Sequence, residues 1–376
     1  MKDLLEDTLT HLQWLVASPT ENPPKRIDES RILERLGREL SPDFEVSLTD
    51  LGDGSLTLFA TRGRPKILWN FHLDTVPAAA DWTGNPFELR VDASTKRAIG
   101  LGVCDIKGAA AAMLAAVQAT SGDVALLFST DEEAGKGRCI AAFLEEGHAY
   151  EGVVVAEPTQ GRAVLAHRGI GTASGRFVGL AGHASRASAL LDSANHEAVR
   201  WASRALEHAA VSMHAPGGTA GALTGLRFNL GRIEGGEKPN VVAAEARVRF
   251  GVRPPPGVAP LDALQTFQKL APHADRVAWE TGFLGAPLPA DKGDALALRG
   301  ESLAKWLGLE VGPPVDFWTE AALFSAAGFP ALVFGSGDIA QAHTRDEWVA
   351  LSELAHVAST YARVLSIPTP APSRPS

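Results

Sequence analysis

The first 170 residues alternate short apolar runs with segments of helical periodicity. The apolar runs are bounded by polar or turn-forming residues and lie at 56–60, 67–71, 124–128 and 153–156. Such runs are typical of strands that are covered on both faces. The segments around them predict helices at 4–16, 32–40, 107–120 and 138–146. Strands that alternate with helices favour an α/β fold with a mostly parallel sheet.

The pattern changes after Arg168. Strands are predicted at 172–178, 226–233, 245–252 and 276–280, and helices at 196–209 and 261–270. The order β-α-β-β-α-β indicates a small open sheet with helices on one face. The α/β pattern then resumes, with a strand at 331–334 and helices at 294–307, 321–327 and 351–365.

These changes predict a domain inserted into another domain. We expect a larger α/β domain made of residues 1–169 and 285–366, with a smaller α+β domain of residues 170–284 between its parts. Residues 367–376 contain four prolines and no periodicity, which is typical of a flexible tail.

Composition narrows the class of protein. The chain has 376 residues and is 45% hydrophobic, enough for a large core, and its net charge of −9 argues against nucleic-acid and anionic-membrane partners. The longest strictly apolar run, 109–117, falls short of the roughly 20 residues that span a bilayer. The acidic first residues do not resemble a secretory leader. The two cysteines fit a reducing cytoplasm.

Potential metal ligands follow the ends of several predicted strands, the edge at which open α/β sheets bind ligands. They are His72 and Asp74; Asp105, at the start of a helix; Asp131, Glu132 and Glu133; Glu157; and His343. Each group alone also has a structural explanation. His72 could be a loop histidine, Asp105 a helix N-cap, and residues 131–133 a solvated acidic turn.

Together these residues favour a metal centre. His72, Asp105, Glu133, Glu157 and His343 could hold two divalent cations, with one carboxylate shared. Nitrogen and oxygen ligands without thiolate suit zinc, cobalt or manganese. Asp74 could hold the second nitrogen of the His72 ring. Glu132 is then free to act as a general base.

The strings at 72–77, 100–108 and 131–133, in that order, resemble the dinuclear zinc aminoacylase and carboxypeptidase family, which includes acetylornithine and succinyl-diaminopimelate deacylases. The resemblance implies two divalent metal ions, zinc or cobalt, with manganese as a further alternative. It assigns His72 and Glu157 to one ion, Glu133 and His343 to the other, and Asp105 to both. It also implies a cis peptide bond after Asp105.

The same resemblance gives the inserted domain a role as a lid or dimerisation domain. His183, in the string 182–185, would reach the active site of the partner in a homodimer and stabilise the oxyanion. Asn240 would contact substrate, and Arg253 would bind a substrate carboxylate. Three prolines follow Arg253 and leave the path of that loop open.

The implied activity is metal-dependent hydrolysis of an N-acetylated amino acid in cytoplasmic arginine biosynthesis. We favour N-acetyl-L-citrulline as the substrate. N-acetyl-L-ornithine and other N-acyl amino acids stay open, because Glu320 could pair with the ornithine ammonium group. A non-catalytic, metal-stabilised binding protein is a more remote alternative.

Overall fold

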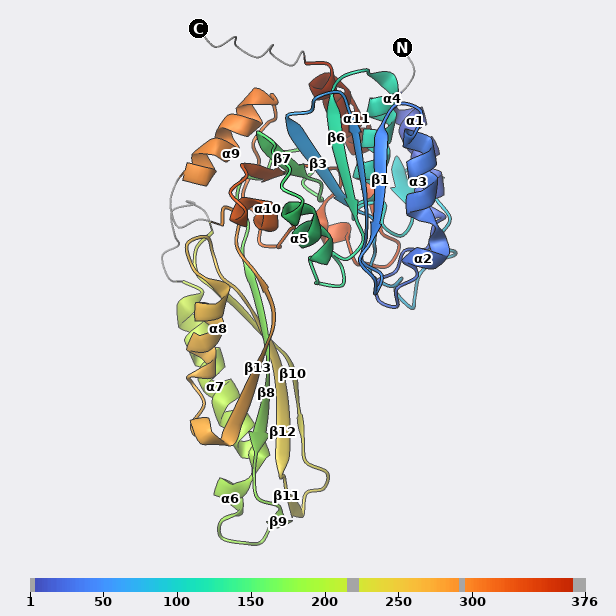
Figure 1. Ribbon diagram of the computed structural model, residues 1–376. Helices are drawn as coiled ribbons and strands as arrows, with labels where there is room; N and C mark the ends of the chain where they lie inside the picture. Colours follow the sequence, from blue (N-terminus) through green and yellow to red (C-terminus); the bar gives the residue numbers. More distant parts are fainter. Residues whose placement is uncertain (1–3, 215–222, 291–294, 368–376) are drawn as a thin grey trace. The chain divides into compact units, whose positions relative to one another are not determined.

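The computed structural model describes residues 4–214, 223–290 and 295–367 and divides into two compact units (Figure 1). Within these residues, the first unit comprises the chain up to Leu165, Leu298–Gly312, and the chain from Thr319 onward. The second unit comprises Ala166–Ala297 and Pro313–Trp318. Apart from Ile367, the tail predicted at 367–376 lies outside the described residues.

A six-stranded sheet forms the centre of the first unit. Its order is β1 (Glu45–Asp50), β2 (Leu56–Arg62), β6 (Val124–Ser129), β3 (Ile67–His72), β7 (Gly152–Val155) and β14 (Ala331–Val333). The neighbours from β6 to β14 run parallel, whereas β1 and β2 are antiparallel additions at one side. Every residue of β3 and β6 is buried, as the apolar runs predict. The α/β class with a mostly parallel sheet is confirmed.

Helices pack around this sheet. They are α1 (Leu4–Val16), α2 (Ile27–Ser30), α3 (Ile32–Leu40), α4 (Lys107–Ala119), α5 (Arg138–Glu145), α9 (Ala295–Trp306, in this unit from Leu298), α10 (Ala321–Ala326) and α11 (Leu351–Leu365). Alanines 109–112 of α4 are fully buried, and α1 and α11 both pack against this helix. Small side chains permit this close approach. Among the described residues, no helix has the length and apolarity needed to cross a membrane.

The first unit also contains a smaller, three-stranded sheet. It pairs β15 (Trp348–Ala350) with β5 (Arg97–Ile99), and β5 with β4 (Arg90–Asp92). The 3-10 helix η2 (Ile339–Gln341) precedes β15. Because β5 precedes the segment that contains Asp105, this sheet anchors the chain just before that segment.

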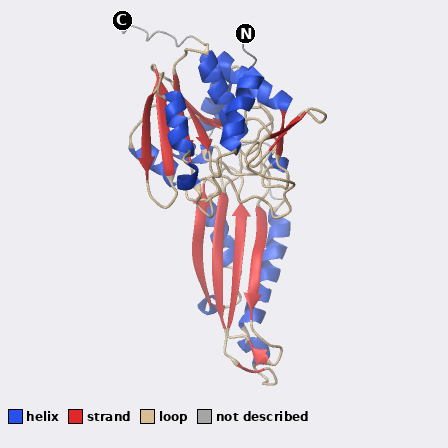
Figure 2. Cartoon of the chain, turned by 90° about the vertical axis from the view of Figure 1, so that its right-hand side faces the viewer, coloured by secondary structure: helices blue, strands red, loops and turns tan. Residues whose placement is uncertain are grey.

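The second unit contains a four-stranded antiparallel sheet (Figure 2). Its order is β10 (Arg227–Gly235), β12 (Glu245–Arg253), β8 (Ile170–Val178) and β13 (Val277–Gly285). Helices α7 (Ala194–Ser212) and α8 (Pro260–Gln268) cover one face, where Trp201 of α7 packs against buried Phe177 and Phe250 of the sheet. The remaining elements are β9 (Gly182–His183), β11 (Val241–Val242), α6 (Ala189–Asp192) and η1 (Ala274–Arg276). The predicted β-α-β-β-α-β order is confirmed.

Candidate metal centre

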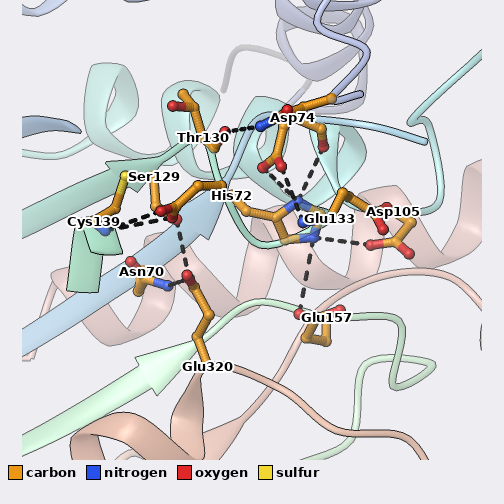
Figure 3. Close-up of polar contacts among 12 residues, drawn as sticks. Asn70, His72, Asp74, Asp105, Ser129, Thr130, Glu133, Cys139, Glu157 and Glu320 are labelled. Carbon is orange, nitrogen blue, oxygen red and sulfur yellow. Dashed lines mark hydrogen bonds and ion pairs between the residues drawn. The ribbon is translucent and has the colours of Figure 1, made fainter. Parts of the chain in front are cut away.

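Three parallel strands bring potential ligands to one edge of the large sheet. His72 is the last residue of β3, Glu133 follows the end of β6, and Glu157 follows the end of β7. Since carboxyl ends of parallel strands meet at the same edge, these side chains converge (Figure 3). Asp105, just before α4, and His343, just after η2, reach the same place.

The converging side chains form two groups that share one residue. In the first group, His72 Nε2 lies 3.0 Å from Asp105 Oδ1 and 3.9 Å from Glu157 Oε1. In the second, His343 Nε2 lies 3.3 Å from Asp105 Oδ2 and 2.9 Å from Glu133 Oε1. The potential ligand atoms of each group lie within 4.8 Å of one another. Asp105 therefore offers a different oxygen to each group.

The carboxylates of this cluster lie close together and are largely buried, which favours the binding of cations. Burial, and then the charge of Asp105, raise the pKa of Glu157, whose Oε1 has no hydrogen-bond partner among the described residues. Contacts with Asp105 and Glu133 raise the pKa of His343 to about 10. Burial opposes a charge on His72, but the contacts with Asp105 and Asp74 outweigh it and raise its pKa. Imidazole nitrogens with carboxylate oxygens are the donor set of zinc and related ions, so the residues fit two such ions.

Asp74 supports both groups through its main chain and its side chain. His72 Nδ1 lies 3.1 Å from the carbonyl oxygen of Asp74 and 3.6 Å from its carboxylate Oδ1. The carbonyl is the nearer of the two acceptors, and the carboxylate also lies beside the ring, so the orientation of His72 by Asp74 stays a prediction. Asp74 Oδ2 instead accepts a hydrogen bond from the backbone N–H of Glu133 at 3.0 Å. Such contacts fix the tautomer and direction of a metal ligand.

The three adjacent acids after β6 separate in the structure. The Asp131 carboxylate accepts hydrogen bonds from the backbone N–H groups of Arg138 and Cys139, at the start of α5. Glu133 lies beside His343. Burial, together with the negative charge of Glu133, raises the pKa of Glu132 well above its ordinary value. A raised pKa suits a carboxylate that takes up a proton near neutral pH.

Glu320 belongs to a buried network beside β3 and β6. Its Oε2 accepts hydrogen bonds from Asn70 Nδ2 at 2.7 Å and from Ser129 Oγ at 3.0 Å (Figure 3). Burial, and then the charge of Asp131, raise the pKa of Glu320 to about 7. Sequence reasoning did not select Asn70, whose partner lies 250 positions away along the chain. Recognition of substrate by Glu320 stays a prediction.

The remaining predicted site residues lie in the second unit. His183 of β9 pairs with Val241 of β11, and the N–H of Ala184 donates to the carbonyl of Asn240 at 3.1 Å. His183 and Asn240 are exposed neighbours. Arg253 ends β12 and, with Arg227 and others, lines a hollow of about 600 Å³ on the open face of the sheet.

Two further observations concern the segment around Asp105. The peptide bond between Asp105 and Ile106 is cis, as the family resemblance implies. Glu347 accepts hydrogen bonds from backbone N–H groups in this segment. The sequence analysis gave Glu347 no role. Its one sign of a function was its place in the polar segment that begins near His343.

Known proteins match this chain along most of its length. The model of peptidase family M20/M25/M40 matches residues 68–367. An N-acetyl-L-citrulline deacetylase from Xanthomonas campestris pv. campestris is 49% identical over 370 residues, 97% of this chain and 99% of the relative. An acetylornithine deacetylase from Aliivibrio salmonicida is 30% identical, covering 82% of this chain and 83% of the relative.

A solved structure shares the fold. Aminopeptidase PepT from Bacillus cereus superposes with a TM-score of 0.73 at 17% identity, covering 96% of this chain and 98% of the other. At 17% identity, this likeness shows the fold alone. The family match and the 49% identical relative also indicate the type of reaction. The chain is therefore a hydrolase that belongs to peptidase family M20/M25/M40, which confirms the resemblance found in its sequence.

Proposed function

We propose that this hydrolase removes the acetyl group from N-acetyl-L-citrulline and releases citrulline and acetate. The observation that carries the proposal is the 49% identity, along almost the whole of both chains, to a relative with that activity in its name. We place the reaction in arginine synthesis. We also place it in the cytoplasm, a reducing compartment, which is supported by two cysteines that are buried free thiols.

We propose that the two groups around Asp105 each hold one divalent ion, zinc or cobalt, with manganese as an alternative. His72 and Glu157 would hold one ion, Glu133 and His343 the other, and Asp105 both. Bound there, such ions polarise an acyl carbonyl and lower the pKa of water from 15.7 towards about 7.

The protein's own groups then move a proton and fix the substrate. Glu132 accepts a proton from the water that attacks the acyl carbon and delivers it to the departing amine nitrogen as the C–N bond breaks. His183 donates a hydrogen bond to the oxyanion that develops on the acyl oxygen. Arg253 binds the substrate carboxylate through two parallel N–H groups, and Asn240 adds a polar contact.

The positions of these residues support a homodimer built through the second unit. Asn240 and His183 lie beyond the start of β12, and Arg253 lies at its end. The eight steps from Glu245 to Arg253 span roughly 26 Å at about 3.3 Å per residue, which exceeds the length of an N-acetyl amino acid. One copy of the chain therefore cannot bring all three side chains to one substrate. We propose that a partner supplies His183 and Asn240.

Mixing two inactive variants tests this dimer. His183→Ala and Glu132→Ala should each be nearly inactive alone. After subunit exchange, activity should recover to about a quarter of wild type, because half of randomly paired twofold dimers are mixed and each mixed dimer holds one intact site. Steady-state assays before and after mixing measure the recovery. Absence of recovery despite exchange, or an active monomer in sedimentation, would contradict a role for His183 across the interface.

Comparing two substrates side by side tests the identity of the acyl amino acid. Asn70 and Ser129 both bind Oε2 of the buried Glu320, and its Oε1 has no hydrogen-bond partner among the described residues, so these contacts do not decide between the two substrates. On the strength of the 49% identical relative, we expect kcat/KM for N-acetyl-L-citrulline to exceed that for N-acetyl-L-ornithine by at least about 10²-fold.

The reverse preference would contradict the proposed substrate and favour the acetylornithine activity named for the 30% identical relative. Hydrolysis of neither compound by metal-loaded protein would contradict both acetyl substrates and favour another N-acyl amino acid or the binding-protein alternative.

A further inference from the structure

Glu347 is a buried carboxylate that binds main chain rather than another side chain. It immediately precedes β15 and is 2% exposed. Its Oε1 accepts hydrogen bonds from the N–H groups of Cys104 at 2.8 Å and Asp105 at 3.0 Å, and its Oε2 accepts one from Gly102 at 2.9 Å. Both oxygens are thus used for one short segment of the chain.

That segment needs an acceptor of this kind. Residues 100–106 connect β5 to α4 without strand or helix partners, and Leu101 to Ile106 are buried. A buried N–H group without a partner is costly, and the two oxygens of one carboxyl group can accept several hydrogen bonds at once. The main chain adds a further link, since the N–H of Gly100 donates to the carbonyl of Glu347 at 3.1 Å. Glu347 therefore fixes the path of the backbone at Asp105.

We propose that Glu347 is a positioning residue for the metal centre, which holds the backbone of Asp105 so that its two carboxylate oxygens reach both ligand groups. The proposal rests on the metal-ligand roles proposed above. His343 lies four residues before Glu347. One short segment thus supplies a ligand to the second group and holds the ligand that both groups share.

This arrangement predicts a specific pattern of metal affinities. Because Asp105 belongs to both groups, a loosened backbone at Asp105 should weaken the binding of both ions. Glu347→Gln preserves the size of the side chain but turns an amide NH₂ towards backbone N–H donors. We expect both equivalents of zinc to bind about 10- to 100-fold more weakly, the usual cost of losing a group that supports a metal ligand.

Calorimetric titration of metal-free protein with zinc measures these affinities without any assay of activity. The matched control is Glu353→Gln. Glu353 accepts a hydrogen bond from the N–H of Gly337 at 2.7 Å, is partly exposed, and makes no hydrogen bond to residues 102–105. The control should bind two equivalents of zinc with wild-type affinities. Thermal unfolding of both metal-free variants checks that they remain folded.

The outcomes separate this proposal from the proposed function. If wild type binds two equivalents and Glu347→Gln binds them equally tightly, the role of Glu347 is overturned and the metal centre stands. If wild type binds fewer than two equivalents, the proposed metal centre fails, and this inference with it.

Should Glu347→Gln not fold, hydrogen exchange on wild type provides the test. The amides of Cys104 and Asp105 should exchange slowly, although they belong to no helix or strand. Rapid exchange at both amides would overturn the proposal.

Discussion

Replacing Glu132 with glutamine should lower kcat by at least about 10²- to 10⁴-fold while the protein still binds two metal ions. Glutamine keeps the size of the side chain but cannot accept and return a proton. Glu132 belongs to neither group of potential ligands, so its loss should leave metal binding in place. The expected result is therefore an intact metal centre without proton transfer.

Steady-state kinetics and elemental analysis on the same preparation separate these two effects. Glu146→Gln is the control, since Glu146 is an exposed carboxylate on the same stretch of chain whose contact is with His148. The control should keep wild-type turnover and metal content. Near-full turnover of Glu132→Gln with metal bound would show that another group transfers the proton.

Replacing Asp105 with asparagine should abolish activity and weaken both metal sites at once. The two Asp105 oxygens lie beside different imidazoles, at 3.0 Å from His72 Nε2 and 3.3 Å from His343 Nε2. Asparagine keeps the shape but removes the negative charge and one of the two oxygens. The loss of affinity should exceed the about 10- to 100-fold that follows when only a supporting residue is removed.

Zinc titration of metal-free protein checks this second result. Asp131→Asn is the control, because the Asp131 carboxylate accepts hydrogen bonds from the first two backbone N–H groups of α5 and an asparagine oxygen can accept them in its place. It should bind two equivalents with wild-type affinity. If Asp105→Asn lost one equivalent and kept the other unchanged, Asp105 would serve a single ion and the shared-ligand arrangement would be wrong.

The sequence predicted the structure best where a residue pattern is compatible with only one arrangement of the chain. The buried strands β3 and β6 follow from their continuous apolar runs, and the convergence of His72 and Glu157, two potential metal ligands, follows because parallel strands end at one edge. By contrast, β1 lacks an apolar run, since nearly all of its side chains are exposed, and it was not predicted. Apolar runs also carry no information on strand direction, so the antiparallel pairing of β2 with β6 was not foreseen.

Within the site, contacts between distant segments were the hardest to predict. Glu347 binds the N–H of Asp105 from 242 positions away, and no spacing in the sequence indicates that bond. The same holds for Asn70 and Glu320. Residue type and spacing suggested that Asp74 orients His72, but the sequence does not indicate that the Asp74 carbonyl is a nearer acceptor than its carboxylate. These hydrogen-bond partners depend on the path of the folded backbone, so the structure is needed to identify them.

Diffraction at the zinc absorption edge, from crystals of the zinc-loaded protein, tests the central claim most directly. Two anomalous peaks should appear, one beside His72 and Glu157 and the other beside Glu133 and His343. Both should lie at about 2.0–2.2 Å from oxygens of Asp105, the usual zinc–carboxylate distance. A single peak, or a pair of peaks with Asp105 bound to one of them or to neither, would contradict a dinuclear centre that shares this carboxylate.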